Sequence, residues 1–258
     1  WHGQRDASRV DGLVVEIAVV GLDSIPPRTW ETPMKKMICA MGPAVLVTLF
    51  IWSRAPAADT TALRQESEKG FVPMFDGKSL KNWVVMPEKA AAAWSVQDGM
   101  IVGEGDKGRS YLVFANRNVA DFELKFSYRF PGKGNSGVNI RARVDKTGKR
   151  GFQGYHADLG HVGIGKQVLG AWDFHTPGRR EHACFRGDRL VIDKGDNPTV
   201  TRIDGAVTVK EIRKGGWNDV HVIAHDNHFQ LYINGKLSSE FIEHLETKRR
   251  LHRGMNQL

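Results

Sequence analysis

Hydrophobic and polar residues alternate along the segment GNSGVNIRAR, residues 134–143. The two alternating sets are Val138, Ile140 and Ala142 on one side, and Asn139, Arg141 and Arg143 on the other. Because successive side chains of a strand point to opposite faces of a sheet, this period of two predicts a strand with one apolar face in a core. The pattern leaves open whether the polar face meets water or a ligand rich in oxygen atoms.

Further segments predict strands in the same way. DFELKFSYRF, residues 121–130, alternates throughout and predicts one long strand. WSVQDGMIVGE, residues 94–104, predicts a hairpin with Asp98-Gly99 at its turn, because this pair accepts the positive φ angles of a two-residue turn. WNDVHVIAHDNHFQLYING, residues 217–235, predicts a second hairpin. Many short strands without intervening helices predict an all-β sandwich or jelly roll.

Composition and charge limit the classes of partner that the protein is expected to bind. The 258 residues are 41% hydrophobic and 26% charged, which is an ordinary globular balance. The net charge is +8, but the basic residues are scattered apart from Lys248–Arg250, and no groove-reading helix accompanies them. Nucleic acid is therefore not an expected partner. The two cysteines, Cys39 and Cys184, are far apart in sequence and predict no disulfide framework.

The first seventy residues are expected to lie outside the domain. Met34 opens a typical secretory signal at residues 34–57, with two lysines, an apolar stretch and a small-residue cleavage site before Ala58. The apolar stretch is shorter than the ~20 residues that span a bilayer, although an uncleaved anchor remains an alternative. Residues 1–33 are then translated upstream sequence, and residues 58–70 a linker. This predicts an exported protein, periplasmic or extracellular, whose domain occupies residues 71–258.

Five motifs from Phe71 onward resemble, in order and spacing, the 3-keto-disaccharide hydrolase domain. They are FVPMFDGKSLKNW, NSGVNIRAR, GYHADLG, GAWDFHTPGRR and GGWNDVHVIAHDNHFQLYING. The resemblance implies a concanavalin A-like jelly roll of two antiparallel sheets that acts on sugars with a ketone at C3. Members of the family usually continue past the segment RLHRGMNQL with further strand residues, so we expect a jelly roll without its last strand and with an open edge.

In such a fold, polar residues on the outer face of one sheet would contact sugar hydroxyls. Asn139 and Arg141 are expected on this face, and the alternation in GYHADLG places His156 and Asp158 together there. A His and an Asp on one face can supply an acid and a base to one ligand. Asp158 is assigned as the base and His156 as the acid. A solvated pair on a strand exterior is the alternative.

The segment GAWDFHTPGRR adds candidates for substrate binding. Trp172 offers an aromatic platform, while Asp173, Arg179 and Arg180 offer charged groups, in a stretch rich in Gly and Pro. Arg141, together with Arg179 or Arg180, is assigned as the electrophile that stabilises an enolate, and we expect Arg141 to lie beside Asp158. The alternative places Trp172 in the core and the arginine pair in a solvated turn.

The reaction that the resemblance implies is glycosidic cleavage of 3-keto-glycosides or 3-keto-disaccharides. The ketone acidifies the C2 hydrogen, so a base can remove it, the C1–O bond breaks by elimination and water then adds. No cofactor is predicted, although a divalent cation could replace the arginine as electrophile. His221, His225 and His228 are expected to be exposed strand residues. The alternative function is a non-catalytic, lectin-like glycan-binding module, because one sandwich fold serves both.

Overall fold

The computed structural model describes residues 12–21, 71–105, 109–118, 121–147, 151–165, 167–175, 180–244 and 255–257. The predicted signal segment 34–57, the linker 58–70 and Arg179 lie outside these ranges.

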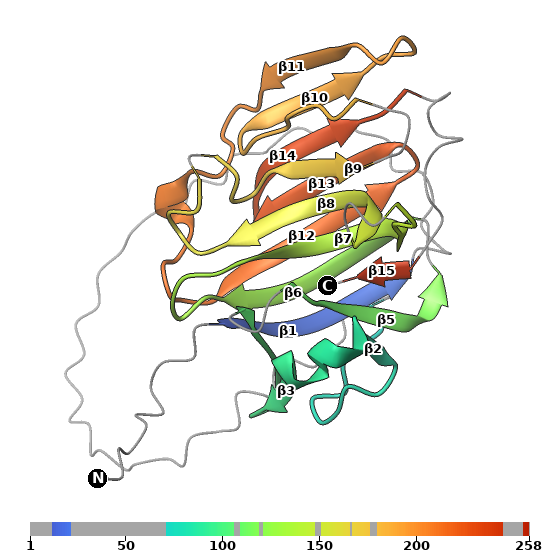
Figure 1. Ribbon diagram of the computed structural model, residues 1–258. Helices are drawn as coiled ribbons and strands as arrows, with labels where there is room; N and C mark the ends of the chain where they lie inside the picture. Colours follow the sequence, from blue (N-terminus) through green and yellow to red (C-terminus); the bar gives the residue numbers. More distant parts are fainter. Residues whose placement is uncertain are drawn as a thin grey trace, which may run out of the picture. The chain divides into compact units, whose positions relative to one another are not determined.

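The described strands form two sheets, which we call sheet A and sheet B (Figure 1). Sheet A contains, in spatial order, β11 (Pro198–Arg202), β10 (Asp188–Ile192), β14 (Lys236–Ile242), β13 (His228–Ile233), β12 (Asn218–His225), β6 (Phe122–Arg129), β1 (Gly12–Gly21), β4 (Met100–Glu104) and β3 (Trp94–Gln97). Sheet B contains β2 (Trp83–Met86), β5 (Tyr111–Asn118), β15 (Met255–Gln257), β7 (Asn135–Val144), β8 (Phe152–Gly160) and β9 (Trp172–His175). Two short 3-10 helices, η2 (Glu88–Ala93) and η4 (Val209–Glu211), accompany them.

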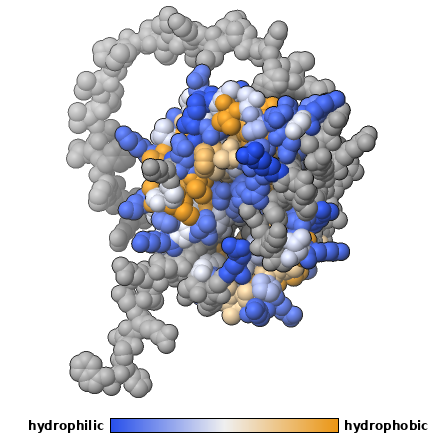
Figure 2. All heavy atoms as spheres, turned by 45° about the horizontal axis from the view of Figure 1, so that its top comes forward, coloured by the Kyte–Doolittle hydropathy of each residue, from blue (hydrophilic) through white to orange (hydrophobic). Residues whose placement is uncertain are grey.

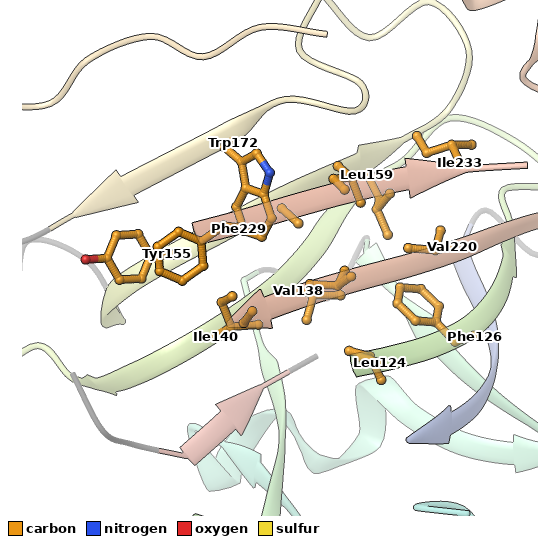
Figure 3. Close-up of a cluster of buried hydrophobic side chains, with 14 of the residues drawn as sticks. Leu124, Phe126, Val138, Ile140, Tyr155, Leu159, Trp172, Val220, Phe229 and Ile233 are labelled. Atoms are coloured by element: carbon orange, nitrogen blue, oxygen red, sulfur yellow. The ribbon is translucent and has the colours of Figure 1, made fainter. Parts of the chain in front are cut away.

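The two sheets share one core, which confirms the all-β sandwich. Alternate residues of both sheets are fully buried and lie against one another, including Val138, Ile140 and Tyr155 of sheet B and Leu124 and Phe229 of sheet A (Figure 3). The rings of Tyr155 and Phe229 stack across the interface, with centroids 4.5 Å apart. All paired strands run antiparallel among the described residues except β10 and β14, which are parallel.

Both predicted hairpins are confirmed. β3 pairs with β4 around Asp98 and Gly99, which take the positive φ angles expected of this turn. β12 pairs with β13 around Asp226 and Asn227, with His225 opposite His228. Local turn chemistry therefore determines these connections and the registers that follow from them.

The N-terminal segment differs from the prediction. Residues Gly12–Gly21 form β1, an interior strand of sheet A that pairs antiparallel with β4 on one side and β6 on the other. The expectation that residues 1–33 lie wholly outside the domain is wrong for this strand. Its apolar residues pair with partners about eighty residues or more away, which a local pattern does not reveal.

The C-terminal segment also differs from the prediction. β15 lies inside sheet B, between β5 and β7. The prediction was an open sheet edge where the last strand would be missing. Among the described strands, β15 lies in the interior of sheet B and β1 in the interior of sheet A. Among the strands that the structure describes, the outermost are β11 and β3 in sheet A, and β2 and β9 in sheet B.

A β-bulge interrupts the alternation of β7. Ile140 pairs with Tyr155, but the next pair is Arg143 with Gln153, so Arg141 and Ala142 together oppose Gly154. Arg141 takes a positive φ of 47°, the conformation that adds one residue to a strand. The bulge exchanges the two faces beyond Ile140. Ala142 therefore lies with an outer-face apolar cluster, and the predicted position of Ala142 beside Val138 is wrong.

The visible described surface is largely hydrophilic, with hydrophobic residues in small groups (Figure 2). None of the helices among the described residues has the length and apolar character needed to cross a membrane.

Candidate functional site

One row of directly opposed residues crosses the outer face of sheet B. Opposed residues of neighbouring strands share a face, so the register alone places this row. From β2 to β9 it runs Val84, Val113, Gln257, Asn139, His156 and Asp173. The row is apolar on β2 and β5 and polar on β7, β8 and β9.

The polar half of the row centres on His156. Its Nδ1 lies 3.1 Å from Oδ1 of Asn139 on β7, and its Nε2 lies 3.3 Å from Oδ1 of Asp158 on the same strand. The side chains of His156 and Asp158 are 27% and 15% exposed, so both are mostly shielded yet still reachable from solvent. We call Asn139, His156 and Asp158, with Asp173 opposite His156, the His156 cluster.

The absence of a side chain at Gly137 makes room for the His156 ring. Gly137 lies opposite Asp158, and a Cβ atom there would come within 2.4 Å of His156 Cε1, His156 Nε2 and the Ala157 carbonyl oxygen. Such distances are far below van der Waals contact, so the ring lies over β7 because this position is glycine. Gly137 is not among the residues predicted for the site, and the Asn-Ser-Gly motif is the sequence signal that contains it.

The geometry of the His156 cluster suits proton transfer. Nδ1 of His156 donates to the Asn139 oxygen when that nitrogen carries the proton, which leaves Nε2 to exchange a proton with the Asp158 carboxylate. With its oxygen facing the ring, Asn139 has its amide NH₂ available as a donor to a ligand. The predicted grouping of Asn139, His156 and Asp158 on one face is therefore what the structure contains.

The apolar part of the outer face was not predicted. Val113, Ala142 and Phe152 are buried there and pack with Met86 and Tyr111. The rings of Tyr111 and Phe152 meet edge to face, with centroids 4.7 Å apart. The bulge in β7 contributes Ala142 to this cluster, and that is why simple alternation assigned the residue to the other face.

Arg141 lies away from the His156 cluster. The bulge turns its side chain to the inner side, where it is 2% exposed and its guanidinium lies 4.9 Å from the centroid of the Phe229 ring. It donates to the Asp226 carbonyl and, at 2.7 Å, to Asp121. Arg141 therefore links the sheets at the β12–β13 turn. The prediction that it lies beside Asp158 is wrong, because Asp158 pairs with Gly137, four residues earlier on β7.

The three remaining described candidates for substrate binding lie in different environments. Trp172 pairs with Ala157 and lies in the core with 2% exposure, so it is no sugar platform and the predicted alternative for it holds. Asp173, one residue later, faces outward opposite His156 and is partly buried. Arg180 is exposed, beyond the end of β9.

Cysteine and histidine side chains outside the His156 cluster are buried or contact other residues. Cys184 is buried, and burial raises the pKa of its thiol to about 12, so it is no nucleophile at neutral pH. His221 contacts Glu123, and His228 contacts Glu240, on the outer face of sheet A. Within the described ranges, no three His, Cys, Asp or Glu side chains converge as metal ligands.

Comparison with known families identifies the domain. Residues 70–256 match the 3-keto-alpha-glucoside-1,2-lyase-like domain. The chain belongs to this family. It is therefore a member of a carbohydrate-acting, glycosidase-type family.

Two solved structures are among those similar to the chain. A protein of Parabacteroides distasonis described as a glycosyl hydrolase shares 18% identity over 69% of this chain and 76% of its own, with a TM-score of 0.44. The kappa-carrageenase of Pseudoalteromonas carrageenovora, solved with an oligotetrasaccharide of kappa-carrageenan, shares 13% identity over 68% of this chain and 79% of its own, with a TM-score of 0.24. No curated protein matches the chain.

Proposed function

We propose that the His156 cluster cleaves glycosidic bonds of 3-keto-glycosides or 3-keto-disaccharides by elimination. Family membership supports a carbohydrate substrate. The observation that carries the proposal is the placement of His156 between Asn139 and Asp158 on an outer face of the sandwich, partly open to solvent. This supplies an acid, a base and an amide donor within a few ångströms of one another.

In the proposed reaction, each proton and each electron pair moves between named atoms. The Asp158 carboxylate takes the proton from C2 of the sugar, and the electron pair of that bond forms an enolate with the C3 carbonyl. As the enolate collapses, C1=C2 forms, the C1–O bond breaks, and the departing oxygen takes a proton from His156 Nε2. Asp158 then returns its proton to His156 across the 3.3 Å contact. Addition of water to C1=C2 completes hydrolysis.

The developing enolate oxygen needs a donor. Arg141 is not assigned this role, because its guanidinium is engaged with Asp121 and the Asp226 carbonyl. The Asn139 amide NH₂ lies on the correct face and takes its place in the proposal. A divalent cation bound together with the substrate is the alternative electrophile.

The decisive experiment compares a chromogenic 3-keto-glucoside with the parent glucoside. The protein is expected to release the chromophore from the 3-keto compound only, because the parent lacks an acidic C2 hydrogen. In D₂O, recovered 3-keto substrate should also exchange its C2 hydrogen. Binding of the 3-keto compound without release or exchange would assign the domain to the lectin-like class.

We also propose that residues 34–57 direct export of the protein, because their charged, apolar and small-residue regions follow the order of a secretory signal.

A further inference from the structure

The base and the acid of the proposed reaction approach the substrate from the same side. His156 and Asp158 project from one face of β8, and Nε2 of His156 lies 3.3 Å from Oδ1 of Asp158. A sugar ring between these two groups would hold them about 7 Å apart, because each side of the ring needs a contact distance of about 3.5 Å. The ring of the substrate therefore lies on one side of the pair, over the outer face of sheet B.

The neighbours of His156 hold its imidazole beside Asp158. Oδ1 of Asn139 lies 3.1 Å from Nδ1 of His156. The imidazole also packs over Gly137, where a Cβ atom would come within 2.4 Å of two of its atoms. A rotation that carried the imidazole to the far side of a bound sugar would break both contacts. The acid and the base therefore stay together during the reaction.

The two anomers of a 3-keto-glucoside differ in the side on which the leaving oxygen lies. The C2–H bond is axial in both anomers and points to the same side of the ring. The C1–O bond lies on that side in the β-anomer and on the opposite side in the α-anomer. Because reacting atoms must approach to about 3–3.5 Å, the β-anomer needs its base and its acid on one side of the ring, and the α-anomer needs them on opposite sides.

The positions of the catalytic groups decide the stereochemistry of other glycosidases, in which the distance between two carboxyl groups separates retention from inversion. We propose that the His156 cluster selects the β-anomer of 3-keto-glucosides and removes the C2 proton and the leaving oxygen from one side of the ring. This inference rests on the proposed function, because it takes Asp158 as the base and His156 as the acid. The family description names an α-glucoside, so the placement of this pair gives the chain the opposite anomeric preference.

The two anomers share the first step of the reaction and differ in the second. In both, Asp158 takes the C2 proton, and the electron pair of that bond forms the enolate with the C3 carbonyl. In the β-anomer, C1=C2 then forms, the C3 carbonyl is restored, and the leaving oxygen takes the electron pair of the C1–O bond and the proton of His156. In the α-anomer the leaving oxygen points away from His156. Its enolate therefore recovers a proton at C2 more often than it loses the leaving group.

The test compares methyl 3-keto-α-glucoside with methyl 3-keto-β-glucoside in D₂O by NMR. Methoxide is a poor leaving group, so release of methanol depends on the acid. Both anomers should exchange the C2 hydrogen for deuterium, and the β-anomer should release methanol about 10²-fold faster or more, because a general acid contributes about 10²–10⁴-fold. Exchange with equal release, or with faster release from the α-anomer, overturns the anomeric preference alone. Neither exchange nor release from either anomer overturns the proposed function and this inference with it.

A good leaving group should reduce the preference. Because 4-nitrophenolate departs without a proton, the two 4-nitrophenyl 3-keto-glucosides should differ in release rate by a smaller factor than the two methyl compounds. An equal factor in both pairs would show that binding contacts, and not the position of the acid, select the anomer, and would overturn the proposal.

Two matched variants test His156 directly. His156→Gln removes the acid, so the ratio of β to α methanol release should fall towards one. His161→Gln is the control, because Nδ1 of His161 contacts the backbone of Gly134, and this variant should keep the ratio. Both rates are measured on one preparation, so partial unfolding of a variant leaves the ratio unaffected. An unchanged ratio in His156→Gln would overturn the assignment of anomer selection to His156.

Discussion

His156 Nε2 lies 3.3 Å from Oδ1 of Asp158, two residues further along the same strand. Side chains two residues apart on a strand share a face, so a single strand, β8, aligns this pair. Asn139 on β7 holds the other ring nitrogen. The pair is thus set by regular sheet geometry and not by a loop.

Substitution of Asp158 should lower turnover, whereas substitution of Asp173 should lower substrate affinity. Asp158→Asn removes the proposed base but keeps the shape of the side chain, so turnover of a 3-keto-glucoside should fall about 10²-fold or more with little change in affinity. Asp173→Asn should act mainly on affinity, because Asp173 stands on the far side of His156 from Asn139. Steady-state kinetics with direct binding measurements resolves the two. Loss of affinity with intact turnover in Asp158→Asn would assign Asp158 to recognition.

Gly137→Ala should displace the His156 ring. The added methyl would come within 2.4 Å of two ring atoms and of the Ala157 carbonyl. We expect a loss of turnover together with a destabilisation of about 1–3 kcal/mol from overpacking, measured by kinetics and denaturant unfolding. Gly105→Ala is the control, because a Cβ there meets nothing within 4 Å. Wild-type turnover in Gly137→Ala would mean that the ring position is unimportant.

Arg141 should matter for stability and not for catalysis. Arg141→Gln removes its charged hydrogen bonds to Asp121 and the Asp226 carbonyl, and a loss of about 1–3 kcal/mol in unfolding free energy is expected. Turnover per folded molecule should stay near the wild-type value. Arg180→Gln, at an exposed position, serves as the stability control. A large fall in turnover with unchanged stability would restore Arg141 to the catalytic site.

Cys184 should resist alkylation in the folded protein. Burial raises the pKa of its thiol to about 12, so the reactive thiolate is scarce in the folded protein at pH 8. Iodoacetamide followed by peptide mass spectrometry should modify Cys184 only after denaturation. Because its folded pKa lies above the unfolded value, the shift favours folding at pH values below the unfolded pKa, and this contribution declines as the pH rises through the folded pKa. Rapid labelling at pH 8 under native conditions would contradict the buried position.

Export can be tested by measuring the mass of the exported protein, which reports where its N-terminus lies. A chain that starts at Met34 should yield an exported product beginning near Ala58, while one that starts at Ala58 should stay in the cytoplasm. Full-length protein in the membrane fraction would instead indicate an uncleaved anchor.

Local patterns predicted most of the sandwich. Strict alternation in Phe122–Arg129 and the Asp98-Gly99 turn determine their own structure, because only neighbouring residues are involved. The same alternation placed His156 and Asp158 together. What it could not give is a pairing between distant segments, as for β1, or the face of a residue in an irregular Gly-rich stretch, as for Trp172. Such features depend on the whole sheet.

The bulge at Arg141 divides β7 into two stretches of opposite phase. Before it, odd-numbered positions such as Asn139 face outward; after it, even-numbered positions such as Ala142 do. Deletion of Arg141 would rejoin the two stretches into a regular strand. Ala142 would then follow Ile140 directly and keep its outward face, and the residues after it would keep their faces as well. The deletion would remove only the link that Arg141 makes to Asp121 and Asp226. The extra residue therefore lets β7 send one arginine across to the other sheet while both of its own faces stay intact, and relatives without this residue should keep the outer apolar side chains and lose the link.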